Sequence, residues 1–138
     1  MKLVTLISDN KALSNIALLF ARLSMAAIFL LAGLNKVQYY DGNAQYMASS
    51  GLPAELLPLV IVFEIGAALL IITGFMTQIT AIALAGFSIV SALLFHFNLG
   101  DQMQFIMFFK NVAMAGGFLA LAATGAGRFS VDHKILSK

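Results

Sequence analysis

The sequence contains no cysteine and few charged residues. Of its 138 residues, 61% are hydrophobic and 10% are charged, whereas about a quarter of a typical soluble domain is charged. The absence of cysteine excludes disulfides, thiol redox chemistry, thiolate metal sites and covalent haem attachment. The scarcity of charge excludes a surface that faces water all round, so much of the apolar surface must face lipid.

Several functional signatures are also absent. The sequence has no Gly-rich phosphate loop, no nucleophile elbow and no pair of catalytic carboxylates. The net charge is +2 and the pI is near 9.1, but the basic residues are scattered singly and form no patch. We therefore expect no nucleic acid partner. A non-catalytic membrane subunit is favoured over a self-sufficient enzyme.

Four apolar runs predict membrane-spanning helices over about 12–34, 56–75, 79–97 and 105–124. Each is close to the roughly 20 residues that a helix needs to cross a hydrocarbon core of about 30 Å. The first run is too long for a secretory signal peptide and carries Arg22 near its centre. The sequence predicts an all-α membrane protein, with a four-transmembrane-helix bundle that forms one domain over 1–138.

The loop over 35–55 predicts a short helix that lies at the membrane interface. Asp41 is expected to cap this helix, which continues to about Ser49, and Gly51 is expected to end it before Pro53. Aromatic and apolar side chains in the loop favour the interfacial position. They are Tyr39, Tyr40, Tyr46 and Met47.

The distribution of basic residues predicts the orientation. The two terminal segments carry five cations, namely Lys2, Lys11, Arg128, Lys134 and Lys138. The first and third loops carry only Lys36. By the positive-inside rule, both termini face the cytoplasm, and the expected location is a bacterial inner membrane.

Residues at helical spacing predict which faces point into the bundle, because small side chains let membrane helices approach closely. The face of the third span is Ala81, Ala85, Ser88 and Ala92, continued by His96. The face of the fourth span is Ala113, Gly117, Ala120 and Thr124. The first span presents Arg22, Ala26, Phe29, Gly33 and Lys36 on one face.

Polar residues within or beside the spans are the candidate ligand-binding residues, because charges in a bilayer usually pair inside the bundle. They are Arg22, Lys36, Glu64, His96, Lys110 and Asn111. Depths counted from the helix starts place Arg22 level with Glu64 and predict an ion pair between them. The remaining cations, with Asp101 offsetting one charge, suggest a site for an anion or for a carbonyl such as that of a quinone.

Structural interpretations of the same residues remain open. An Arg22–Glu64 pair is also compatible with a purely structural role that fixes helix register. Lys36 and Lys110 are both compatible with extension to the outer headgroups, which is the expectation for Lys36. His96 is compatible with simple exposure to water. Neither His96 nor His133 has companions at metal-ligand spacing, so no metal is predicted.

Several of these features together resemble the DoxX family, and within it the YphA-like inner-membrane members. They are the arginine of the first span, GLNK (33–36), the glutamate of the second span, FFKNVAMAGGFLALAATGAG, and SVD (130–132). The resemblance covers about 17–132. It implies a four-helix fold in the bacterial inner membrane, a link to thiosulfate:quinone oxidoreductase and oxidative-stress complexes, and shared positions at Arg22, Lys36, Glu64, Lys110 and Asn111.

Three functions therefore compete. The first is a quinone- or small-anion-interacting subunit of a membrane oxidoreductase system, which needs a redox partner subunit because the chain has no redox centre of its own. The second is a transporter or channel for a small solute, against which the lack of inverted repeats counts. The third is a structural or assembly subunit, and the close-packing faces and short loops suit a homo- or hetero-oligomer.

Overall fold

The computed structural model of the chain describes residues 2–137, and every regular element in this range is a helix. The elements are α1 (Lys11–Gln38), α2 (Tyr40–Ser49), the 3-10 turn η1 (Ala54–Leu56), α3 (Leu57–Thr73), α4 (Thr77–Phe95), α5 (Gln102–Thr124) and α6 (Val131–Leu136). Within the described range, four helical segments are long and apolar enough to cross a membrane: Lys11–Gln38, Ala54–Thr73, Thr77–Phe95 and Gln102–Thr124. The predicted all-α fold with four spanning helices is confirmed.

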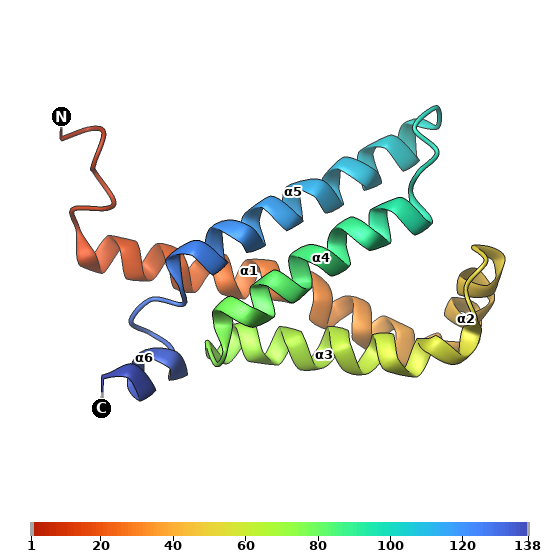
Figure 1. The fold of residues 1–138 in the computed structure, drawn as a ribbon, viewed down its shortest axis with the longest axis horizontal. Coiled ribbons are helices and arrows are strands. Elements are labelled where there is room, and N and C mark those ends of the chain that lie inside the picture. Colours follow the sequence, from red (N-terminus) through yellow and green to blue (C-terminus); the bar gives the residue numbers. More distant parts are fainter. Residues whose placement is uncertain (1, 138) are drawn as a thin grey trace.

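The long helices pack as two antiparallel pairs. Helix α1 lies along α3, and α4 lies along α5, whereas contacts between the two pairs are sparse. The pairs meet near the turn from α3 to α4 and diverge toward the end of the molecule that holds α2 (Figure 1). We refer to these as the α6 end and the α2 end. Both terminal segments lie at the α6 end, as four spans require (Figure 1).

Side chains of the connecting segments start three of the helices. Asn10 accepts the backbone N–H of Leu13 at the start of α1, and Ser130 accepts that of His133 at the start of α6. Asp101 accepts the N–H of Gln104, so its carboxylate caps α5. The N-cap of α2 is Tyr39, without a side-chain hydrogen bond, so the cap predicted at Asp41 is wrong. Asp41 lies instead in the first turn, where its charge still suits the helix dipole.

The predicted inner faces of α1 and α4 are confirmed. Arg22, Ala26, Phe29 and Gly33 are the buried residues of α1, and Ala81, Ala85, Ser88 and Ala92 are all buried in α4. The face predicted for α5 is wrong, since Ala113, Ala120 and Thr124 are exposed. The buried residues of α5 are Asn111, Ala115, Phe118 and Leu121. Small residues of α4 already allow close approach, so α5 turns larger side chains inward, and Phe118 packs edge-on against Phe29.

Arg22 holds the α6 end together, and the ion pair predicted between Arg22 and Glu64 is wrong. Its Nε and Nη2 donate to the carbonyls of Ile71 and Ile72 at 3.0 and 2.8 Å. Its Nη1 donates to the carbonyls of Ala126 and Phe129 at 2.9 and 2.8 Å. The side chain is only 1% exposed. Carbonyls in the last turn of a helix lack intrahelical hydrogen-bond donors. The guanidinium supplies donors to such carbonyls of α3 and also to carbonyls of the segment after α5, so it joins the two segments.

The depth estimate failed because α1 extends beyond the α6 end of α3 (Figure 1). Counting from the start of α1 therefore places Arg22 too deep in the membrane. Its partners Ile71 and Ile72 lie seven or eight residues beyond Glu64, which is about 11 Å along the helix. Arg22 is thus level with the end of α3, and Glu64 is well out of its reach.

Asp132 fastens the C-terminal segment to the turn between α3 and α4. Its carboxylate accepts the backbone N–H groups of Met76 and Thr77 at 2.7 and 2.8 Å. Its own N–H donates to the Gly74 carbonyl at 2.9 Å. Met76, the N-cap of α4, supplies no side-chain hydrogen bond, so Asp132 serves as the cap from a distant part of the chain. Burial raises the pKa of Asp132, but hydrogen bonds from Thr77 and Met76 and the charge of Arg22 outweigh it, so this pKa is lowered.

We predict that Gly74→Ala destabilises the bundle. Gly74 has φ of +71°, and an added Cβ would collide with the Ser130 side chain and lie 3.1 Å from Arg22 Cζ. Backbone strain alone costs roughly 1–2 kcal/mol, and displacement of the guanidinium adds to it. Thermal unfolding in detergent measures the effect. Gly66→Ala in α3 is the control, because its Cβ meets no atom within 4 Å. Equal melting temperatures for the two variants would contradict this account of the α6 end.

We also predict an acid-sensitive step that depends on Asp132. The pKa is lowered from its ordinary value of 3.8, so the stabilisation is complete above pH 3.8 and is lost as the pH falls through the lowered value. Melting temperatures measured from neutral to acidic pH should show this loss in the wild type. Asp132→Asn should melt roughly 4 °C lower at neutral pH and lack the step. Asp41→Asn, which changes an exposed carboxylate, should retain it.

Candidate functional site

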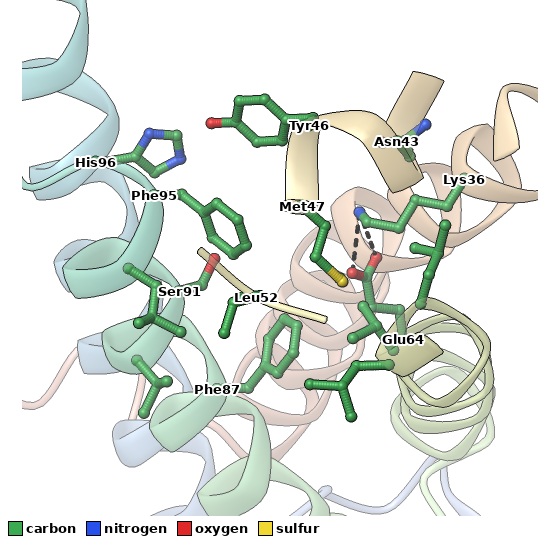
Figure 2. A pocket seen from close by; sticks show the side chains of 15 residues that line it. Lys36, Asn43, Tyr46, Met47, Leu52, Glu64, Phe87, Ser91, Phe95 and His96 are labelled. Atoms are coloured by element: carbon green, nitrogen blue, oxygen red, sulfur yellow. Dashed lines mark hydrogen bonds and ion pairs between the residues drawn. The ribbon is translucent and has the colours of Figure 1, made fainter. Parts of the chain in front are cut away.

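A cavity of about 330 Å³ lies at the α2 end, where the two helix pairs diverge. It is bounded by the end of α1, by α2, by the first half of α3 and by the second half of α4. Figure 2 shows the Lys36–Glu64 ion pair on one wall and Ser91, Phe95 and His96 on the opposite wall. The remaining lining is mainly apolar and includes Met47, Leu52, Leu57, Val60 and Phe87. We call this space the large cavity.

A second cavity of about 170 Å³ adjoins the large one, on the side of α1, α4 and α5. The two cavities share lining residues, namely Lys36, Glu64, Phe87, Ser91 and His96. The second cavity adds Ser88, Lys110 and Asn111, so seven of its twelve lining residues are polar. We call it the small cavity. The two together form a cleft between the helix pairs, with a polar side and an apolar side.

The Lys36–Glu64 ion pair joins α1 to α3 and lines both cavities. The ammonium Nζ lies 3.0 Å from Oε1 and 3.3 Å from Oε2 of the carboxylate. The Glu64 side chain is 4% exposed and that of Lys36 is 23% exposed. Lys36 therefore turns into the bundle, and the expectation that it extends to the headgroups is wrong. It lies in the last turn of α1, where a cation also interacts favourably with the helix dipole.

His96 links the end of α4 to the start of α5. It is the C-cap residue of α4, and its Nδ1 lies 3.0 Å from the Oε1 of Gln104. An Nδ1–H donor in this bond leaves Nε2 of a neutral ring as a hydrogen-bond acceptor. His96 lines both cavities and is partly buried, so it is not simply exposed to water. Within residues 2–137, no three His, Asp or Glu side chains lie close enough to hold a metal ion.

Asn111 and Lys110 are adjacent in α5 but differ in their contacts. The buried Asn111 amide donates to the carbonyl of Ser88 at 3.2 Å and ties α5 to α4. The Lys110 ammonium forms no hydrogen bond or ion pair within residues 2–137, although Lys110 is partly buried and lines the small cavity. A charge at this depth is expensive unless something compensates it. Lys110 is therefore the cation of the cleft that lacks a protein partner in the described range.

The structure brings five of the six predicted site residues together. Lys36, Glu64, His96, Lys110 and Asn111 line the small cavity, whereas Arg22 lies at the α6 end with its donors directed at carbonyls. Asp101 caps α5 and does not offset a charge of the cleft, contrary to expectation.

Sequence reasoning did not single out Ser91 or include Tyr46 in the site. Ser91 lines both cavities, and Tyr46 lines the large one, where its ring stacks on Phe95 with centroids 5.5 Å apart. The spacing of Ser91 three residues after Ser88 was the available signal for the first. No local pattern placed α2 over α4, so Tyr46 gave no comparable signal.

Comparisons with known proteins agree with this architecture. The sequence model of the DoxX family matches residues 17–97. The chain is 44% identical over 128 residues to the Escherichia coli inner membrane protein YqjF, covering 93% of this chain and 98% of that protein. It is 38% identical over 133 residues to the E. coli inner membrane protein YphA, covering 91% and 95%. No solved structure matches. The family match ends before the FFKN stretch, but both relatives extend past it. The chain belongs to the DoxX family.

Proposed function

We propose that this protein is an inner-membrane subunit of an oxidoreductase system and that its cleft binds the head group of a quinone. The observation that carries the proposal is Lys110, which lines the small cavity and whose ammonium has no protein partner among residues 2–137. Two relatives named as inner membrane proteins support the location. With both termini in the cytoplasm, the α2 end and its cleft lie in the outer half of the membrane.

The cleft has the chemistry that a quinone head group requires. A quinone is a flat apolar ring with carbonyl oxygens that accept hydrogen bonds. The cleft offers Phe87 and Phe95 as aromatic walls and Lys110 and Ser91 as donors. Ligand sites are usually apolar cavities with a few well-placed polar groups, and about 330 Å³ is within their usual size range.

The charge balance favours a neutral ligand over a multiply charged anion. Glu64 neutralises Lys36 through a direct ion pair, so only the charge of Lys110 is left uncompensated in the cleft. A sulfur oxyanion with two charges would leave one of them unpaired among apolar walls, which is unfavourable. A quinone carbonyl accepts a hydrogen bond from Lys110 without that penalty.

The residues of the cleft provide binding and proton exchange rather than electrons. Reduction of a quinone to a quinol takes two electrons and two protons, and the electrons come from a partner subunit. Glu64 and His96 both line the small cavity and are the ionisable groups placed to exchange protons with the ligand. Arg22 takes no part, because its donors are engaged at the α6 end.

We predict that Lys110→Met lowers the amount of quinone that co-purifies with the protein. Loss of a hydrogen bond from a charged donor should weaken binding by about tenfold or more. Melting temperature in detergent should barely change, because Lys110 forms no bond within the described residues. Small-molecule mass spectrometry of the purified protein measures the bound quinone. Lys134→Met, which removes an exposed cation of α6, is the matched control. Equal quinone in wild type and Lys110→Met would rule out this site.

A second prediction separates the structural and ligand-binding roles of the ion pair. Lys36→Met or Glu64→Gln alone should lower stability by about 3–5 kcal/mol, because each leaves a buried group without its partner. The double variant should regain most of this stability but bind little quinone, since both side chains line the cleft. A double-mutant cycle with both readouts tests this. Full quinone content in a stable double variant would make the pair purely structural.

A further inference from the structure

An apolar groove continues from the large cavity along the seam between α3 and α4. Two shallow hollows, both open to the outside of the bundle, follow each other there. The first shares Leu56, Val60 and Phe87 with the large cavity. It shares Phe63 and Ala83 with the second, which continues to Leu70 and Ile79 near the α6 end. Each space therefore shares part of its lining with the next, and we call the part beyond the large cavity the seam groove.

The seam groove exists because small residues meet where α3 and α4 diverge. Gly66 and Ala67 of α3 and Ala83 of α4 line it, and an ideal Cβ on Gly66 meets no atom within 4 Å. Apart from the Thr80 hydroxyl, no polar side chain lines either hollow. From Leu56 to Leu70 the groove follows 14 residues of helix, which is about 21 Å.

We infer that the ligand of the cleft carries one long apolar chain that lies in the seam groove, so the chain of a lipid-soluble isoprenoid quinone binds here together with its head. The inference rests on the proposed function, because it assigns the tail of the ligand whose head occupies the cleft. The observation that carries the inference is that the groove shares Leu56, Val60 and Phe87 with the cleft. A molecule that enters from the bilayer between α3 and α4 reaches the polar groups without crossing water.

Two features favour an isoprenoid quinone over a phospholipid. The groove is about 21 Å long, whereas one leaflet contributes only about half of a 30 Å hydrocarbon core. The far end of the groove at Leu70 therefore lies deeper than one leaflet, and a chain attached at the depth of Glu64 reaches it along about 9 Å of helix. In addition, Glu64 lies seven residues into α3, or about 11 Å from its start, so the head site is deeper than the headgroup level.

The test compares two probes in nanodiscs by native mass spectrometry: a benzoquinone bearing a long isoprenoid chain, and the same head bearing a methyl group. A chain also raises the concentration of a probe in the bilayer, so the measured quantity is the ratio of the two affinities in each variant. Gly66→Leu fills the groove. Gly86→Leu is the matched control, because Gly86 also has no atom within 4 Å of an added Cβ and lines none of these spaces.

We expect Gly66→Leu to lower the affinity ratio about tenfold, since a few buried methylene groups account for such a factor. The methyl-bearing probe should bind Gly66→Leu as it binds the wild type, and Gly86→Leu should keep the wild-type ratio. Equal ratios in all three proteins, with the methyl-bearing probe still bound, would contradict binding of the chain in the seam groove. Binding of the head group in the cleft would remain supported. Failure of both probes to bind would overturn the proposed function itself. Displacement of the long-chain probe by a lysophospholipid of matched chain length would make the groove a general lipid site and overturn the assignment.

Discussion

The hydrogen bonds from Arg22 to four backbone carbonyls are the interaction on which the shape of this bundle depends. Two of the carbonyls close the end of α3, and the other two belong to the segment after α5. A single buried guanidinium thereby holds the ends of both helix pairs to α1. Its planar group has five N–H donors in fixed directions, which the ammonium of a lysine cannot reproduce. Because the α6 end is fixed in this way, the helix pairs can diverge at the other end without coming apart.

The two ends of the bundle differ in how their polar groups are satisfied. At the α6 end, Arg22 and Asp132 bond to backbone groups of turns and helix ends that lack helical partners. Bonds of this kind rigidify the backbone and leave little capacity for a ligand. At the α2 end, Lys36 bonds to Glu64 and His96 to Gln104, whereas Lys110 forms no bond in the described range. Of the polar residues that line the small cavity, Asn111 bonds to a backbone carbonyl, that of Ser88. The capacity for binding is therefore concentrated where the pairs diverge.

Helical periodicity in the sequence predicts which face of a helix is buried, and it predicts little about how far one helix is shifted along another. Helical spacing identified the inner faces of α1 and α4, because buried residues there recur on one side of each helix. It also brought Lys36, Glu64, His96, Lys110 and Asn111 toward one interior. For α5, small residues occur on more than one face, so their spacing selected the wrong one. The partner of Arg22 was missed because periodicity gives the direction of a side chain but not the axial offset between helices.

The ion pair of Lys36 and Glu64 explains why Lys110 is the decisive charge of the cleft. Had Glu64 paired with Arg22, two lysines would face the cavities uncompensated, and an anion would be the natural ligand. Arg22 is instead satisfied by carbonyls, so Glu64 is free to neutralise Lys36. The cleft then keeps one cation beside a neutral pair, with apolar walls and an apolar groove leading away from it. The ligand that we propose for these parts is a neutral head with hydrogen-bond acceptors and a long apolar chain, because such a molecule would reach the cleft directly from the lipid.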